Sequence, residues 1–147
     1  MKKNNYRKIE NWRRESKTFL IEIAHWYTKG RINAYNIDKN ALSHKWNVYV
    51  YISPEHPFFD KMKESISDNY PFLEELHYGC TYCYWYRDEN GSVTMKKYGS
   101  DYMHLNDDHF EDCDSEDHPY AREIFFDAER LFDSFKEAED CKQGALS

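Results

Sequence analysis

A turn signal at Asn90-Gly91, between two runs of residues that favour β-strands, restricts the fold of this chain more than any other sequence feature. Asn and Gly both tolerate positive φ angles, so residues 80–87 and 92–98 are predicted to form a β-hairpin. The hairpin would place the residues before its first strand beside those after its second. The residues that would meet at that end of a sheet are His77, Gly79, Thr81, Gly99, Asp101, His104 and Asp107.

The segments around the hairpin carry periodicities typical of a strand and of helices. Residues 46–52 alternate aliphatic residues or Trp with Asn or Tyr, which predicts a strand that ends before Pro54 and Pro57. Residues 58–66 predict a short helix. Residues 119–139 predict a long helix because apolar residues recur at every third or fourth position.

The first third of the chain is rich in basic residues. Residues 5–28 predict an amphipathic helix, because Trp12, Phe19 and Ile23 fall on one stripe, and Gly30 would end it. Residues 31–45 lose this periodicity and are interpreted as a loop. The other face of the helix carries the basic residues Arg7, Lys8, Arg14 and Lys17, with Arg13 flanking it. These side chains would be either solvated or in contact with a phosphate.

Together these elements predict an α+β fold, with a small, mainly antiparallel sheet and a central hairpin packed by N-terminal and C-terminal helices. The 147 residues are expected to form one domain. Within it, residues 1–45 would be the basic helix and loop, residues 46–140 the α+β core, and residues 141–147 a frayed tail. A thin sheet has an open edge, so we expect a homo-oligomer.

Composition and charge exclude several classes of protein. The net charge of −7 divides unevenly: residues 1–45 hold eleven Lys and Arg against four Asp and Glu, whereas the remainder is strongly acidic. Such a chain is a poor candidate for binding nucleic acid. No apolar run is long enough for a membrane span and no signal core follows the first residues, so we expect a soluble, unsecreted protein. Aromatic residues make up 18% of the chain, which suits planar ligands and protein interfaces.

The cysteines allow two interpretations. Cys80 and Cys83 form a CxxC motif, which with Cys113 and either His104 or His109 would supply four zinc ligands. In a regular strand, however, Cys80 and Cys83 would point to opposite faces of the sheet. We therefore expect free, partly buried thiols, with no bound metal and no cofactor.

The histidines and aspartates near the hairpin are the stronger candidates for function. Asp101 and His104 are three residues apart, and with His77 and Asp107 they would orient one another, bind a divalent metal, read the edges of a nucleotide, or make local structural hydrogen bonds. His56, just before Pro57, would either project over the same end of the sheet or belong to a simple turn. No nucleophile motif, zinc-protease motif or phosphate-binding glycine loop is present.

Three blocks of sequence resemble a widespread family of small phage proteins. They are the strand that leads into His56-Pro57, the segment His77-Tyr-Gly-Cys-Thr-Tyr82, and the segment Gly99-Ser-Asp-Tyr-Met-His-Leu-Asn-Asp107. Family members show a strand ending in His-Pro, a His-Gly-Gly-Leu-Thr-Tyr block and a Gly-Phe-Asp-Cys-x-His-x-Gly-Asp block. This chain departs from the blocks at Tyr78, Cys80, Ser100, Tyr102 and Asn106.

The resemblance implies a viral sponge that binds a cyclic nucleotide second messenger in the host cytoplasm and blocks anti-phage immunity of the CBASS type. The ligand would be a cyclic dinucleotide such as 3'3'-cGAMP, with bases stacked on rings and phosphates near basic side chains. The expected ligand-binding residues are His56, His77, Thr81, Tyr82, Trp85, Arg87, Asp101, His104, Asp107, Arg13 and Arg14. No catalytic residue is expected.

Two other functions remain open from the sequence. One is a metal-dependent nucleotide phosphodiesterase built on His77, Asp101, His104 and Asp107. The other is an acidic mimic of nucleic acid that inhibits a bacterial defence complex, because seven of the eleven residues in 107–117 are Asp or Glu.

Overall fold

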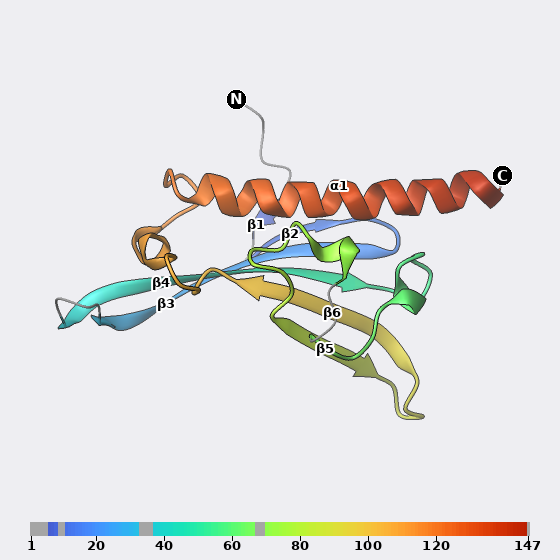
Figure 1. Ribbon diagram of the computed structural model, residues 1–147, viewed down its shortest axis with the longest axis horizontal. Coiled ribbons are helices and arrows are strands. Elements are labelled where there is room, and N and C mark those ends of the chain that lie inside the picture. Colours follow the sequence, from blue (N-terminus) through green and yellow to red (C-terminus); the bar gives the residue numbers. More distant parts are fainter. Residues whose placement is uncertain (1–5, 9–10, 33–36, 67–69, 147) are drawn as a thin grey trace.

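The structure is a computed structural model that describes residues 6–8, 11–32, 37–66 and 70–146 of the chain (Figure 1). The described residues form a six-stranded antiparallel sheet with the strand order β1-β2-β3-β4-β6-β5. The strands are β1 (Arg7–Lys8), β2 (Trp12–Glu15), β3 (Phe19–Ile32), β4 (Ile37–Ile52), β5 (Tyr82–Arg87) and β6 (Val93–Asp101). The helical elements are η1 (Phe59–Lys61), η2 (Pro71–Leu73), η3 (Asp108–Asp112) and α1 (Ala121–Leu146). The predicted α+β class is therefore confirmed.

The N-terminal helix predicted for residues 5–28 is wrong, and so is the loop predicted for 31–45. The described residues of this part of the chain form β1, β2, β3 and the start of β4, all within the main sheet, while residues 5, 9, 10 and 33–36 lie outside the described part. Phe19, Ile21 and Ile23 are buried at alternate positions, which is the period of a strand. They pair with Ile52, Val50 and Val48 of β4.

The predicted hairpin is confirmed as β5 and β6. Tyr82 pairs with Gly99, and the turn contains Gly91 with a φ of 81°. The carboxylate of Asp88 accepts hydrogen bonds from the N–H groups of Asn90 and Ser92, which stabilises the turn. The hairpin lies at one side of the sheet rather than at its centre, because β6 pairs with β4 and leaves β5 as the edge strand.

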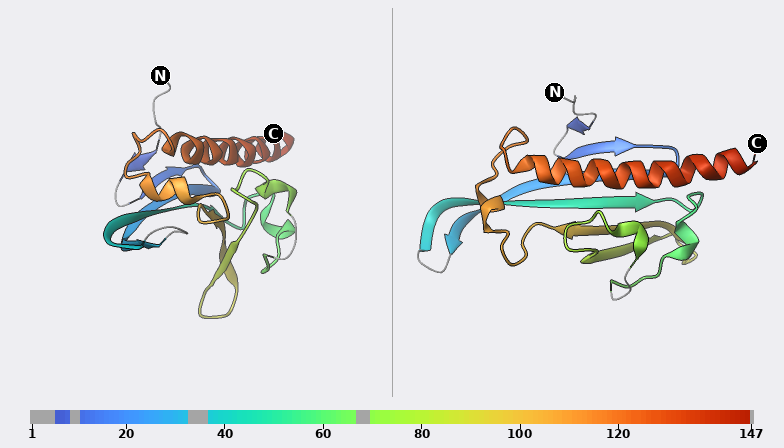
Figure 2. Two further views of the ribbon diagram at one scale, coloured as in Figure 1. Left: turned by 60° about the vertical axis from the view of Figure 1, so that its left-hand side comes forward. Right: turned by 45° about the horizontal axis from the view of Figure 1, so that its top comes forward.

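The long C-terminal helix is also confirmed, and it lies along one face of the sheet (Figures 1 and 2). Its buried stripe includes Ile124, Leu131 and Phe135. The helix continues to Leu146, beyond the end at residue 139 that the sequence predicts, while residue 147 lies outside the described part of the chain. The short helix expected over 58–66 is reduced to the single turn of η1.

The two faces of the sheet differ in their covering. Helix α1 contacts β3 and β4 on the face that carries Phe19, while the segment after β4 contributes Tyr70, whose ring packs against Tyr98 on the same face. The opposite face carries a group of five tyrosines and one lysine that we call the open tyrosine face. Its members are Tyr49, Tyr51, Tyr82, Tyr84, Tyr86 and Lys97.

Candidate functional site

Polar residues from before and after the hairpin meet in a cluster, as the sequence predicts. Nε2 of His77 lies 2.8 and 2.9 Å from the two carboxylate oxygens of Asp107. Asp107 also accepts a hydrogen bond of 2.8 Å from the N–H of His104. The His77 ring stacks on Tyr102, with 4.2 Å between the ring centroids. Asp107 is buried, so this part of the cluster is an internal contact between two loops.

Asp101 and His104 lie at the border of the cluster. Nε2 of His104 is 3.6 Å from Oδ1 of Asp101, which is too long for a hydrogen bond. Asp101 instead accepts a bond of 3.0 Å from the N–H of Met103. Because Asp101 pairs with Asn47 in the sheet register, it stands on the same face as Tyr49, at the end of the open tyrosine face.

Two carboxylates of α1 face His77 from the other side, and the sequence analysis missed both. Oε1 of Glu123 lies 3.9 Å from Nδ1 of His77, and ligand atoms of His77, Glu123 and Asp127 all lie within 4.8 Å of one another. The Tyr102 hydroxyl donates a 2.7 Å hydrogen bond to Asp127. Burial raises the pKa of Asp127, and the bond from Tyr102 partly offsets this. The four-residue spacing of Glu123 and Asp127, which places them on one helix face, is the sequence signal that could have indicated them.

The backbone of the cluster is strained at two positions. Tyr78 and Asn106 are the non-glycine residues of the described chain with positive φ angles, 60° and 72°. Such angles favour glycine, because a Cβ atom crowds the backbone there.

The variant Tyr78→Gly is expected to be more stable than Tyr78→Ala by about 1 kcal/mol, since only alanine retains the Cβ that the left-handed backbone disfavours. Urea denaturation of the two variants measures the difference. Equal stabilities, or a more stable alanine variant, would show that the backbone at Tyr78 carries no such strain.

His56 does not join the cluster, which corrects its assignment as a ligand-binding residue. It is 2% exposed, and its Nε2 lies 2.9 Å from the carbonyl oxygen of Phe135. Its Nδ1 accepts a 3.0 Å bond from the N–H of Phe58. Both ring nitrogens are therefore hydrogen-bonded inside the core, where the imidazole connects the segment after β4 to α1. Neither nitrogen is available to bind a ligand.

The basic residues expected to meet phosphate are engaged elsewhere. Arg13 pairs with Glu22 at 2.8 Å, and the Arg14 guanidinium lies 3.7 Å from the centre of the Phe132 ring. The Arg87 guanidinium forms a bidentate salt bridge with the carboxylate of Glu64, with hydrogen bonds of 2.7 and 2.9 Å. None of the three arginines is in the cluster around His77.

The hairpin residues divide between the two faces. Trp85 lies on the covered face, where its indole N–H donates a 2.9 Å bond to the hydroxyl of Tyr98. Tyr82 lies on the open tyrosine face, because it pairs with Gly99 beside Tyr49. Thr81 is exposed just before Tyr82, and its N–H bonds to Gly99 at 2.9 Å. Trp85 therefore cannot share a ligand with Tyr82 in one subunit.

Lys97 is the central cation of the open tyrosine face, and it is not among the site residues predicted from the sequence. Its Nζ lies 4.1, 4.9 and 5.3 Å from the ring centres of Tyr49, Tyr51 and Tyr82. Within the part of the chain that the structure describes, no carboxylate lies within 4.0 Å of this Nζ. Burial lowers the pKa of Lys97, and the charge of Glu22 partly restores it.

The rings around Lys97 are accessible and neutral. Tyr82, Tyr84 and Tyr86 are 38%, 52% and 37% exposed. Burial, followed by the neighbouring Tyr82, Glu22 and Asp101, raises the pKa of Tyr49 to about 12, so its hydroxyl remains a hydrogen-bond donor at neutral pH. The close approach of Tyr49 to the backbone depends on Gly99, where a Cβ would lie 2.8 Å from the carbonyl oxygen of Val48.

Glu22 does not cancel the charge of Lys97. Its buried carboxylate accepts a 2.8 Å bond from Arg13 and a 2.9 Å bond from the hydroxyl of Tyr51. Glu22 is paired with Arg13, so among the described residues the ammonium of Lys97 forms no ion pair of its own.

The cysteines do not form a metal site. Cys80, Cys83, Cys113 and Cys141 are all free. Of the residues described, the only group of three or more potential metal ligands in close proximity is His77, Glu123 and Asp127. Burial raises the pKa of the Cys80, Cys83 and Cys113 thiols, which disfavours the reactive thiolate.

Comparisons with known proteins assign no family. No family model, curated protein or solved structure matches the chain. Over the described residues, no helix is long and apolar enough to cross a membrane.

Proposed function

We propose that this protein binds a cyclic nucleotide second messenger on its open tyrosine face and holds it without cleavage. The observation that carries the proposal is the unpaired ammonium of Lys97 among the rings of Tyr49, Tyr51 and Tyr82. A cation with no carboxylate partner, surrounded by flat rings, suits a ligand that has both a phosphate and a planar base.

The chemistry of such a ligand matches this face. Bases would stack on the exposed rings of Tyr82 and Tyr84, and each stacked base contributes about 1–3 kcal/mol. Lys97 would bind a phosphate oxygen through a charge-assisted hydrogen bond. Asn47, whose side-chain oxygen is buried without a hydrogen-bond partner, lies opposite Asp101 and would accept a bond from a base or ribose.

The biological role in the proposal rests on the resemblance to the phage family. A sponge would act in the cytoplasm of a bacterial host, where it would lower the concentration of a signal such as 3'3'-cGAMP and block CBASS-type immunity. The positive φ angles at Tyr78 and Asn106 support the resemblance, because the family blocks have glycine at both positions.

An oligomer would complete the site. The open tyrosine face is a surface rather than an enclosed cavity, and ligand sites usually bury most of a small molecule. A second copy, paired through the edge strand β5 or facing the same rings, would enclose the nucleotide.

Calorimetric titration with 3'3'-cGAMP, other cyclic dinucleotides and cyclic ADP-ribose isomers tests the proposal. We expect at least one of them to bind in the micromolar range or tighter. Heating the complex until the protein denatures should then release the nucleotide intact, as shown by chromatography. Failure of every nucleotide to bind contradicts the proposal, and recovery of a cleaved nucleotide indicates a phosphodiesterase instead.

A further inference from the structure

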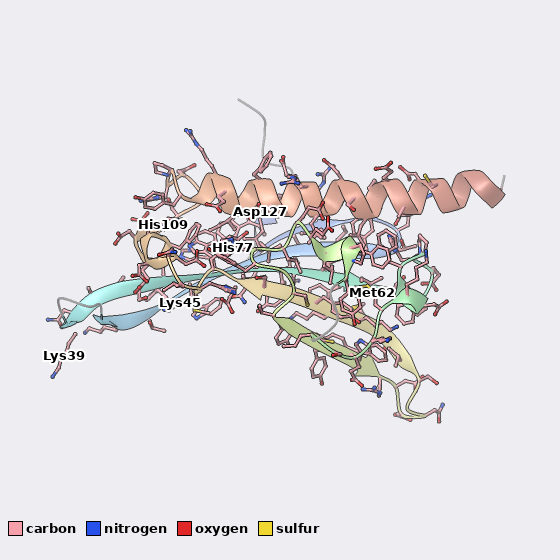
Figure 3. The ribbon with its side chains drawn as sticks, in the orientation of Figure 1. Lys39, Lys45, Met62, His77, His109 and Asp127 are labelled. Atoms are coloured by element: carbon pink, nitrogen blue, oxygen red, sulfur yellow. The ribbon has the colours of Figure 1, made fainter. Side chains whose placement is uncertain are left out.

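His77 is held between carboxylates on both sides. Its Nε2 hydrogen is directed at Asp107, at 2.8 Å, which leaves the lone pair of Nδ1 directed towards α1. Glu123 and Asp127 stand there, one helical turn apart (Figure 3 labels His77 and Asp127, which lie close together between the sheet and the helix). An imidazole that donates one N–H to a buried carboxylate and offers its other nitrogen to further ligands has the arrangement typical of a metal-bound histidine.

Negative charge accumulates around this imidazole. Asp107 contacts Nε2 of the ring, while Glu123 and Asp127 stand on its Nδ1 side. A divalent cation would balance this charge.

We propose that Nδ1 of His77 and the carboxylates of Glu123 and Asp127 bind one divalent transition-metal ion, with Asp107 as the residue that orients the imidazole. One nitrogen and two carboxylate oxygens suit Zn²⁺ or Mn²⁺ better than Mg²⁺, which prefers oxygen ligands alone. The three ligand atoms lie within 4.8 Å of one another and would need to approach by about 1 Å for bonds of about 2 Å.

The side chains allow this movement. Glu123 is 52% exposed, so its long side chain can turn towards Nδ1 without disturbing the core. Its exposure also leaves the remaining coordination positions open to water. The Tyr102 hydroxyl donates a hydrogen bond to Oδ2 of Asp127 and holds this carboxylate in place. The carboxylate keeps further lone pairs that can bind a metal ion. The ion would connect the loop at His77 to the first turns of α1. This proposal differs from the sequence-based expectation that the protein binds no metal.

Titration of chelator-treated protein with Zn²⁺, followed by calorimetry and by thermal unfolding, tests this site. We expect one ion per chain, a higher Tm with Zn²⁺, and at least about tenfold weaker binding in Glu123→Gln and in Asp127→Asn. Asp107→Asn should weaken binding by about 10- to 100-fold, as expected for a residue that orients a ligand. Glu123 is half-exposed, so Glu123→Gln should fold as the wild type does. A loss of binding in this variant therefore reports on the metal site and not on misfolding.

The matched control is His44→Gln. His44 and His25 form a separate pair, with 2.9 Å between ring nitrogens, and would be the main competing site for zinc. Binding that survives His44→Gln and is lost in the α1 variants supports the proposal. No binding to the wild-type protein, or equal binding in the Glu123 and Asp127 variants, overturns it. Nucleotide titration uses a different face, so either proposal can fail without the other.

Discussion

Lys97→Gln is expected to weaken cyclic dinucleotide binding by about 10- to 100-fold, with little change in stability. Glutamine keeps most of the length of the side chain but removes the ammonium, and a charge-assisted hydrogen bond to phosphate contributes about 1.5–3 kcal/mol. The Nζ of Lys97 lies over the rings of Tyr49, Tyr51 and Tyr82, and no hydrogen bond or ion pair of this group is found among the described residues. Calorimetric titration of 3'3'-cGAMP, or of whichever nucleotide binds best, measures the change.

Lys96 is the matched control because it directly precedes Lys97 in the chain and points to the opposite face of the sheet. Its Nζ donates bonds of 2.6 and 2.8 Å to the carbonyl oxygens of Phe59 and Met62. Lys96→Gln should therefore lower the free energy of unfolding by about 1–3 kcal/mol and leave the nucleotide affinity of the folded protein unchanged. The assignment of the open tyrosine face fails if both variants bind as the wild type does, or if Lys96→Gln has the larger effect on affinity.

Glu139→Gln is expected to lower the free energy of unfolding by about 2–4 kcal/mol at pH 7. The buried carboxylate of Glu139 accepts hydrogen bonds from the Ser16 hydroxyl and from both the N–H and the hydroxyl of Thr18, and it pairs with Lys136. These bonds join α1 to the turn between β2 and β3. Glutamine would turn an NH₂ group towards these donors and leave buried donors unsatisfied.

The same carboxylate makes stability depend on pH. Burial alone would raise the pKa of Glu139, but the bonds from Ser16, Thr18 and Lys136 outweigh burial and lower the pKa to about 2. The unfolded chain therefore takes up the proton first, near its ordinary pKa of 4.5. The stabilisation is complete above about pH 5 and is lost as the pH falls towards 2.

Guanidinium denaturation at pH 7 and pH 3 measures both effects. The difference in stability between wild type and Glu139→Gln should shrink at pH 3. Asp140→Asn is the control, because Asp140 is an exposed partner of the same Lys136 and should change stability by less than about 0.5 kcal/mol. A constant difference at both pH values would contradict the assigned role of Glu139.

The parts of the fold that the sequence predicts are those with a local signal. The turn at Asn90-Gly91 and the apolar stripe of α1 each specify their own element. The strand pattern of β3 is ambiguous, since Trp12, Phe19 and Ile23 also fit a helical stripe. The pairing of Phe19 with Ile52, more than thirty residues away, decides in favour of the strand, and no local pattern contains that information.

The candidate site divides in the same way. His77 and Asp107 could be placed together because the hairpin brings their segments to one end of the sheet. The contribution of Glu123 and Asp127 depends on how α1 is rotated about its axis against the sheet. The apolar stripe predicts which side of the helix is buried, but not which polar residues beside that stripe face His77. Lys96 and Lys97 look alike in sequence, and only the register with β4 shows that Lys97 lies on the open face.

The most direct test of nucleotide binding on the open tyrosine face is an NMR titration. Protein labelled with ¹³C-tyrosine is titrated with the nucleotide that binds, and the ring signals are followed. Tyr82, Tyr84 and Tyr49 ring signals should shift, because a stacked base changes the field at each ring, while Tyr102 and Tyr78 beside His77 should change little. Shifts confined to Tyr102 and Tyr78 would place the ligand in the His77 cluster and contradict the assignment of the open tyrosine face.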